Sequence, residues 1–191
     1  MGRRKAVFLD RDGTINEECG YLHRIEDCRF IEGVLTAVAR LNDAGYLVVV
    51  VTNQSGIARG YYGAAELNEL HRYMSEVLAA AGARVDAWYH CPHHPEHSGA
   101  DADCNCRKPF PGMLLQAAAD LDIDLAGSWM IGDKIADVDA GHAAGCRSLL
   151  VATGYGLATA AALAGQVPVF PGLDGAVEYI LAAEGQSFKG A

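Results

Sequence analysis

Short apolar runs alternate with helical patterns along this chain, and that alternation limits the folds available to it. The apolar runs predict strands at 5–10, 46–52, 85–90, 128–132, 146–151 and 167–170. The helical patterns fall near 33–44, 64–81, 111–121, 135–144 and 173–183. Strands separated by helices pair in parallel, and the crossover helices cover both faces of the sheet. We therefore expect an α/β fold, a doubly wound parallel sheet of about six strands.

Size, composition and charge narrow the class of protein. The 191 residues suit one domain, 1–191, and a hydrophobic content of 51% is enough for a sizeable core. No apolar run reaches the ~18 residues of a membrane span. The apolar stretch 6–9 after the basic N-terminus is too short for a signal peptide. A net charge of −9 argues against a nucleic-acid surface. We expect a cytoplasmic enzyme without nucleic-acid or membrane partners.

Two carboxylates, Asp10 and Asp12, lie where the first predicted strand ends. Residues i and i+2 of an extended chain point the same way, and ligands bind at the carboxyl ends of strands in open α/β sheets. Two like charges this close require a cation, a shifted pKa, or both. A nucleophile paired with a general acid beside a metal ion would use this arrangement directly. The alternative is an acidic turn with Gly13 at a positive φ.

Three further segments place polar groups beside predicted strands or helices. The run 48–51 leads into hydroxyl and amide side chains that suit phosphate oxygens: Thr52, Asn53, Gln54 and Ser55. The cation pair Arg107-Lys108 precedes a helical pattern, and the strand at 129–131 leads into Asp133. Each segment alone has a simpler explanation, because strands often end in Thr or Asp to cap the next helix.

Taken in order, the four segments resemble the four motifs of the haloacid dehalogenase superfamily of phosphohydrolases, from Val7 to about Asp139. The resemblance implies that Asp10 takes the phosphoryl group, while Asp12 protonates the leaving alcohol and later deprotonates water. Thr52, with Asn53, would bind the phosphoryl oxygens, and Lys108 would neutralise the nucleophile and the phosphoryl group. Mg²⁺ would be bound by Asp10, Asp133 and the backbone carbonyl of Asp12.

The chemistry needs these residue types. Two unit charges 4 Å apart repel by about 4 kcal/mol at an effective dielectric near 20, so an anionic nucleophile needs cations beside it. Asp12 must be protonated during attack, so we expect a raised pKa in the substrate complex. Asp137 has two possible roles. It could orient Lys134 or the ligands around the metal, or its negative charge could stabilise the N-terminus of the predicted helix.

Cap domains are common in this superfamily, but the chain has little room for one. Only the stretches 13–32 and 91–106 separate the predicted elements around the site. Neither is long enough for a helical or sheet cap. We expect a Rossmann-like core with an open site and no large cap domain.

The second chemical cluster lies in the loop 91–106, inserted after the third strand. Three thiols and an imidazole at C-x-H and C-x-C spacing could form a tetrahedral Cys₃His zinc site: Cys91, His93, Cys104 and Cys106. With every position filled by protein, the zinc would be structural, and it would set the position of Arg107 and Lys108. A disulfide and free cysteines are the alternatives. His94 and His97 are interpreted as solvated loop residues or as partners of the ligands.

The zinc loop narrows the resemblance to two groups in the superfamily. These are the heptose-1,7-bisphosphate 7-phosphatases of bacterial lipopolysaccharide-precursor synthesis and the histidinol-phosphate phosphatases. The segments 16–21, 53–60 and 91–95 favour the first, since the second tends to carry Asp where Ser55 stands. The expected substrate-binding set is Glu18, Cys19, Gly20, Tyr21, Thr52, Asn53, Gln54, Ser55, Arg107, Lys108 and Lys134.

A sugar bisphosphate carries a second phosphate, which a residue of the site must bind. Arg107 is our candidate and Lys134 the second, because a guanidinium binds phosphate in a bidentate manner. A salt bridge inside the zinc loop is the alternative role of Arg107. A catalytically silent binding module is the other function class, and the intact Asp10 and Asp12 argue against it. We expect a monomer.

Overall fold

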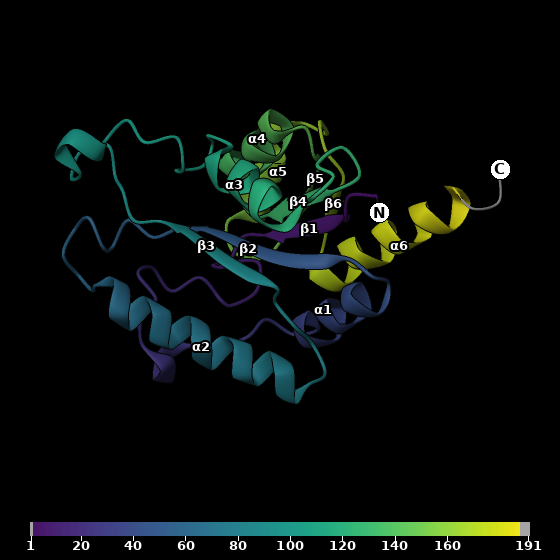
Figure 1. Ribbon diagram of the computed structural model, residues 1–191, viewed down its shortest axis with the longest axis horizontal. Helices are drawn as coiled ribbons and strands as arrows, with labels where there is room; N and C mark the ends of the chain where they lie inside the picture. The colour runs from purple at the N-terminus through teal and green to yellow at the C-terminus, as the bar shows by residue number, and fades with distance from the viewer. Residues whose placement is uncertain (1, 188–191) are drawn as a thin grey trace.

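A six-stranded parallel sheet forms the centre of the structure, a computed structural model that describes residues 2–187 and, from 184 onward, the backbone alone. The strands are β1 (Ala6–Leu9), β2 (Leu47–Asn53), β3 (Ala87–Cys91), β4 (Trp129–Gly132), β5 (Arg147–Val151) and β6 (Val169–Phe170). Their order across the sheet is β3-β2-β1-β4-β5-β6, and every neighbouring pair is parallel (Figure 1). The predicted doubly wound α/β fold is confirmed.

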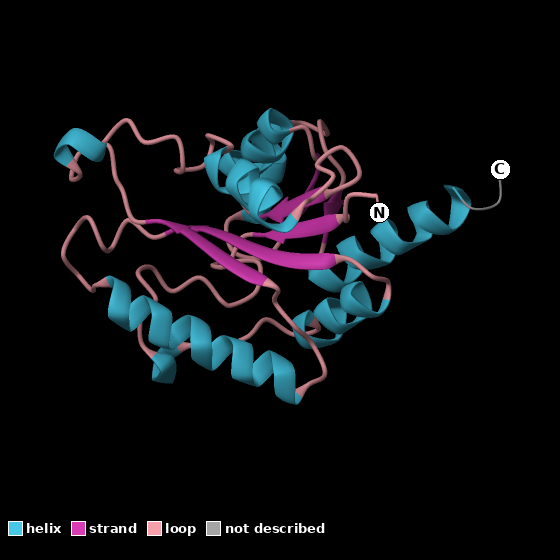
Figure 2. Ribbon diagram, in the orientation of Figure 1, coloured by secondary structure: helices cyan, strands magenta, loops and turns pink. Residues whose placement is uncertain are grey.

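Helices cover both faces of this sheet. Figure 2 shows the sheet edge-on between two layers of helices. One face carries α1 (Val34–Asp43), α2 (Ala64–Ala80) and α6 (Leu173–Ser187). The other carries α3 (Gly112–Leu121), α4 (Ile135–Ala144) and α5 (Gly156–Leu163).

The alternation of strand side chains builds a core on each face. In β1, Val7 and Leu9 join the core under α1, α2 and α6, while Ala6 and Phe8 join the core under α3 and α4. A parallel strand with both faces covered has no polar side, which explains the unbroken apolar runs in the sequence. The buried valines 48–51 of β2 follow the same rule.

One helix was not predicted. The stretch from Gly156 to Leu163 consists mainly of small apolar residues, so it lacks the polar and apolar faces that reveal a surface helix. In the structure, Leu163 packs against Val138 and Leu150. The other five helices and all six strands lie where they were expected.

The fold places the site at the carboxyl ends of the central strands. From β1 the chain continues to β2 on one side, and β4 pairs with β1 on the other, which is a topological switch point. The stretches 13–32 and 91–106 form loops with single 3₁₀ turns at Ile25–Asp27 and Gly99–Asp101. The described residues therefore contain no cap domain.

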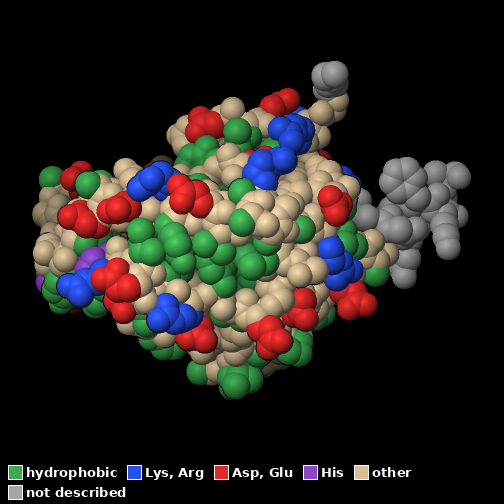
Figure 3. Space-filling model, turned by 90° about the horizontal axis from the view of Figure 1, so that it is seen from below, with side chains coloured by type: hydrophobic (Ala, Val, Ile, Leu, Met, Phe, Trp, Pro, Cys, Tyr) green, Lys and Arg blue, Asp and Glu red, His purple; other side chains and the backbone are tan. Residues whose placement is uncertain are grey.

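Charged side chains of both signs are mixed on one face of the molecule (Figure 3). On the face seen from below, an apolar area is bordered by acidic and basic side chains that are interspersed (Figure 3). This face therefore carries no basic stripe of the kind that follows a phosphate backbone. Among the described helices, none has the length and apolar character needed to cross a membrane.

Candidate active site

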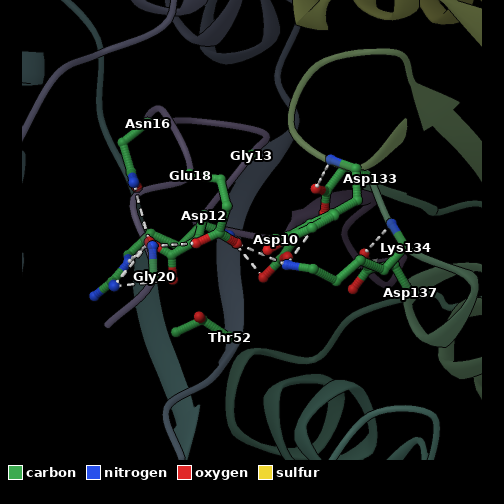
Figure 4. Close-up of polar contacts among 12 residues, drawn as sticks. Asp10, Asp12, Gly13, Asn16, Glu18, Gly20, Thr52, Asp133, Lys134 and Asp137 are labelled. Atoms are coloured by element: carbon green, nitrogen blue, oxygen red, sulfur yellow. Dashed lines mark hydrogen bonds and ion pairs between the residues drawn. The ribbon is translucent and has the colours of Figure 1, made fainter. Parts of the chain in front are cut away.

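The predicted catalytic side chains meet below the carboxyl edge of the sheet. Asp10 follows β1, Thr52 lies near the end of β2, and Asp133 follows β4 (Figure 4). Lys108 reaches the same point from the loop before α3. All four side chains are buried.

Lys108 forms the centre of the charge network. Its Nζ lies 2.8 Å from Asp10 Oδ1 and 2.6 Å from Asp137 Oδ1, and it donates to the Val51 carbonyl at 2.7 Å. Burial alone would lower the pKa of this ammonium, but Asp10 and Asp137 outweigh burial and raise it. The lysine is therefore a permanent positive charge in the site.

The Asp10 carboxyl is buried, and the cations around it do not fully offset the cost of burying its negative charge. Burial raises the pKa of its carboxyl to about 7, Lys108 opposes that rise, and Asp137 adds to it. One oxygen, Oδ1, accepts a hydrogen bond from the Arg11 N–H at 2.8 Å. The carboxyl takes up a proton near neutral pH unless another cation joins the site.

Asp133 presents an unused oxygen to the same space. Its Oδ2 accepts a hydrogen bond from the Tyr155 N–H at 2.8 Å, whereas the buried Oδ1 has no hydrogen-bond partner. Lys134 Nζ lies 3.6 Å from this Oδ1. A buried carboxylate oxygen without a hydrogen bond fits a site that is completed by a cation.

The acidic cluster has the donors that Mg²⁺ prefers. Oxygens of Asp10, Asp133 and Asp137 lie within 4.8 Å of one another. Asp137 already accepts from Lys108 and from the Lys134 N–H at 2.9 Å, so Asp10 and Asp133 are the carboxylates left for a metal. Asp137 therefore caps α4, as one of its two interpretations predicted, and its other oxygen pairs with Lys108, a contact that was not predicted.

Asp12 is held by a dense set of donors. The Arg11 guanidinium donates from Nε and Nη2 to Oδ1, at 3.1 and 2.9 Å, and from Nη2 to Oδ2 at 2.9 Å. Asn16 and Gln54 donate to the two oxygens, each at 3.0 Å. Burial would raise the pKa of Asp12, but Arg11, Asn16 and Gln54 together lower it. The raised value expected for the substrate complex stays a prediction.

Gln54 connects the acid to the predicted phosphoryl-binding residue. Its Nε2 donates to Thr52 Oγ1 at 2.8 Å as well as to Asp12, and its Oε1 accepts from the Tyr62 hydroxyl at 2.6 Å. The predicted contact of Asn53 with phosphoryl oxygens stays a prediction, and the structure adds a contact that was not predicted. The Asn53 amide donates to the Lys108 carbonyl and accepts from the Lys108 N–H, both at 3.0 Å, so its side chain braces that lysine.

A cleft of about 430 Å³ opens above these residues. Its lining residues are Asp12, Glu18, Gly20, Tyr21, Asn53, Gln54, Ser55, Tyr62, Arg107, Lys134 and Tyr155. Most of the predicted substrate-binding set is therefore in the wall. Thr52 and Lys108 are buried, and Cys19 is exposed outside this lining.

The loop after β1 contacts the segment after β4 at the rim of the cleft. Glu18 Oε2 pairs with Lys134 Nζ at 3.1 Å, and Glu18 Oε1 accepts from the Gly20 N–H at 2.8 Å. The Lys134 ammonium also lies over the Tyr155 ring, 5.0 Å from its centroid. The Lys134 ammonium is therefore held by an acid, Glu18.

The loop after β3 gathers the four predicted zinc ligands. The Cys91 Sγ lies 3.6 Å from Cys104 Sγ and 3.1 Å from Cys106 Sγ, and Cys106 Sγ lies 3.5 Å from His93 Nδ1. Zinc with Zn–S bonds of about 2.3 Å would separate tetrahedral sulfurs by about 3.8 Å. All six cysteines are free, so no disulfide joins these thiols.

One thiol of this cluster is poised to ionise. Burial alone would raise the pKa of Cys104, but hydrogen bonds from Cys106 and His93 outweigh it and lower the pKa to about 7. Thiolates are the form that binds metal. The four-residue set therefore fits a metal ion in both spacing and chemistry.

Arg107 leaves this loop toward the cleft. Its Nη1 donates to the His93 carbonyl at 3.1 Å, and it has no acidic partner among the described residues. The alternative of a salt bridge within the loop is therefore wrong. His94 and His97 contact Arg59, with each Nε2 3.0 Å from a guanidinium nitrogen.

Several site residues were missed in the sequence. Arg11 carries no motif signal, because alternation along an extended chain predicts a side chain that points away from the two aspartates. In the structure its guanidinium instead turns back onto Asp12. Tyr62 lies before α2, and its hydroxyl reaches Gln54 only through the fold. Tyr155 precedes the unpredicted helix α5.

Comparisons with known proteins agree with this geometry. A family model described as HAD-hydrolase-like matches residues 105–174. The D-glycero-beta-D-manno-heptose-1,7-bisphosphate 7-phosphatase of Pasteurella multocida is 50% identical over 153 residues, covering 79% of this chain and 83% of that protein. The Escherichia coli K12 protein of the same name is 44% identical over 179 residues, covering 92% and 87%.

A solved structure is also similar to this chain. The D,D-heptose 1,7-bisphosphate phosphatase from B. bronchiseptica, complexed with magnesium and phosphate, superposes with a TM-score of 0.85 at 40% identity. The match covers 94% of this chain and 99% of that one. Similarity therefore extends over nearly the whole of both chains.

Proposed function

The chain belongs to the D-glycero-D-manno-heptose-1,7-bisphosphate 7-phosphatase family of HAD-like phosphatases, and from this we propose that it removes the 7-phosphate of that bisphosphate. The product would serve bacterial heptose and lipopolysaccharide-precursor synthesis. The observation that carries the proposal is the meeting of Asp10, Lys108 and Asp133 beneath a cleft large enough for a sugar phosphate.

The reaction proceeds in two steps on this chain's own residues. A carboxylate oxygen of Asp10 bonds to phosphorus as the bond to the sugar oxygen breaks, and Asp12 gives that oxygen its proton. Water then attacks the aspartyl phosphate, Asp12 takes the water's proton, and inorganic phosphate leaves while the Asp10 carboxylate re-forms. Lys108 and the Thr52 hydroxyl face the phosphoryl group and offset its charge.

The metal would bind at the acidic cluster. Asp10, Asp133 and the backbone carbonyl of Asp12 would hold Mg²⁺, and the unpartnered Asp133 oxygen supports this assignment. When bound, Mg²⁺ supplies the positive charge that lets an anionic nucleophile approach a phosphate.

The second phosphate of the substrate would be bound by residues of the cleft wall. Arg107 would bind it, and Lys134 would assist after leaving Glu18. The expected result for Arg107→Ala is a loss of preference for the 1,7-bisphosphate over the 7-monophosphate in kcat/KM. An unchanged preference would show that another residue reads the second phosphate.

Zn²⁺ is the metal that the loop cluster fits. Cys91, His93, Cys104 and Cys106 would bind it as a structural ion, because four protein ligands leave no open position. It would fix the loop that leads into Arg107 and Lys108.

The enzyme would act as a monomer in the cytoplasm, with a small phosphorylated sugar as its partner.

Phosphate release tests the function. With Mg²⁺ present, D-glycero-D-manno-heptose 1,7-bisphosphate should be hydrolysed with a much higher kcat/KM than histidinol phosphate, and Asp10→Asn serves as the blank. Assaying both anomers identifies the branch of heptose metabolism. Faster hydrolysis of histidinol phosphate would overturn the substrate assignment and keep the catalytic residues.

A further inference from the structure

Arg11 is a buried cation that the reaction does not use directly. Its side chain is 0% exposed, and three of its contacts end on Asp12. The remaining contacts run away from the cleft, from Nη2 to the Leu22 carbonyl at 3.0 Å and from Nη1 to His71 Nε2 at 3.2 Å. Burying a guanidinium costs desolvation free energy, and here every contact holds the plane of the guanidinium group in place.

His71 forms the back of this arrangement. It comes from α2, is 5% exposed, and stacks on the Trp88 ring with centroids 4.4 Å apart. A guanidinium only donates, so His71 Nε2 accepts and the ring proton is on Nδ1. Burial, followed by the charge of Arg11, lowers the pKa of His71 to about 3, and the ring therefore stays a neutral acceptor.

Ser75 fixes the stack from below. Its hydroxyl donates to the His71 carbonyl at 2.8 Å and accepts from Trp88 Nε1 at 3.1 Å. A chain of contacts therefore runs from strand β3 and helix α2 to Arg11 and on to Asp12. Nothing in it faces the cleft except Asp12 itself.

We propose that Arg11, braced by His71, is a positioning residue that holds the Asp12 carboxyl in the orientation needed for proton transfer. The proposal rests on the proposed function for the role of Asp12. Proton transfer needs the acid within hydrogen-bond reach of the leaving oxygen, and a fixed fork restricts both torsions of the short Asp12 side chain. Asn16 and Gln54 complete the restraint.

Leaving-group dependence separates positioning from stability. A sugar alkoxide needs the proton from Asp12, whereas p-nitrophenolate leaves with little help. His71→Leu should lower kcat/KM on the heptose bisphosphate by about tenfold, the size expected when a buried donor loses its partner. We use kcat/KM because it reports the steps through departure of the leaving group and excludes the later hydrolysis of the aspartyl phosphate, which Asp12 assists for every substrate. On p-nitrophenyl phosphate the loss should stay below about twofold.

Matched variants make the result specific. His71→Gln should restore most of the activity, because its side-chain oxygen can replace Nε2 as the acceptor. Leu70→Val removes buried volume from the same helix without touching Arg11, so it should lower the melting temperature and keep the ratio of the two rates. Should His71→Leu fail to fold, Arg11→Lys tests the same ratio, since a lysine cannot form the fork.

If His71→Leu lowers kcat/KM equally on both substrates, the proposal is overturned and His71 is a packing residue. Failure of the proposed function is seen separately, as a wild-type protein that does not hydrolyse the heptose bisphosphate at all. A changed rate ratio that His71→Gln reverses supports the proposal.

Discussion

Lys108 shows how a single side chain can be required by several parts of the site. Its ammonium contacts two carboxylates and a strand carbonyl, while its own backbone is held at both polar groups by Asn53. A buried ammonium is stable only when its donors are satisfied. The positive charge that we propose for phosphoryl binding is therefore held in a fixed position by the protein alone.

Asp137 provides a residue-scale prediction. Asp137→Asn keeps an acceptor for the Lys134 N–H but removes one of the two negative charges beside Lys108. We expect kcat to fall by about tenfold with a small change in melting temperature, because positioning costs of about 1.4 kcal/mol give that factor.

The comparison variant is Asp137→Ala, which also removes the cap of α4. It should lower the free energy of unfolding by about 1 kcal/mol more than Asp137→Asn. Steady-state kinetics and thermal melts on the two variants measure both effects. Equal stability of the two variants would contradict the capping role.

The sequence predicted which polar side chains lie at the carboxyl edge of the sheet, because residues at the ends of parallel strands share one edge. Asp10, Thr52 and Asp133 obey that rule. Arg11 and His71 could not be predicted in the same way, since their contact joins a turn to a helix 60 positions away. Nothing local in either residue signals the partner.

Among the elements, the turn after β1 has the tightest constraint. Gly13 has φ of 85°, and a Cβ built there would overlap the Asp133 carboxylate. Gly154, on the other side, is equally close to Asp133. Two glycines therefore leave room for the carboxylate that is expected to bind the metal.

Gly13→Ala tests that constraint. The added methyl would strain the turn and displace Asp133, so we expect weaker Mg²⁺ activation and a lower melting temperature. A Mg²⁺ titration of kcat measures the first effect. Gly45→Ala is the control, because φ there is 84° but nothing lies within 4 Å of a built Cβ. It should cost stability and leave Mg²⁺ activation unchanged.

The loop 91–106 leads to a second prediction at this scale. Cys104→Ala should reduce bound zinc below one ion per chain and raise KM for the bisphosphate, because Arg107 follows the cluster directly. Metal analysis and kinetics measure the two effects. Asp103→Ala is the control, because Asp103 is exposed in the same loop and belongs to neither group of possible metal ligands there, so this variant should keep the zinc. Equal zinc loss in both variants would contradict the assignment.

Element prediction depended on contrast between polar and apolar positions. The amphipathic helix α2 was evident from its spaced leucines, and the central strands β1 and β2 from unbroken apolar runs. Helix α5 lacked that contrast, and it forms because Leu163 finds a place against β5. Tertiary packing therefore fixed the one helix that local pattern could not.

For the whole molecule, the raised pKa of Asp10 connects pH, metal and stability. Its carboxyl has a pKa of about 7 in the folded protein, against 3.8 ordinarily. Between these values the folded state holds a proton that the unfolded chain releases, so this group's contribution to stability falls as pH rises through that window. A metal at Asp10 replaces the proton and removes the loss.

We therefore expect Mg²⁺ to raise the melting temperature more at about pH 8 than at about pH 6, because protons compete for the same carboxylate at the lower pH. Thermal melts with and without Mg²⁺ measure the difference. Asp10→Asn has no carboxyl to titrate, so its Mg²⁺ response should vary less with pH. A wild-type response that is independent of pH would contradict the linkage.

The uncapped cleft has a consequence for how such a protein changes over time. Its wall is assembled from short loops that follow separate strands, with Glu18, Ser55, Arg107 and Lys134 on different segments. The loop after β1 is anchored in the core by Ile15, Leu22 and Cys28, whereas the four rim side chains lie outside both core clusters. New substrate preferences can therefore arise by exchanging rim side chains one at a time, and laboratory evolution should concentrate its diversity at those positions.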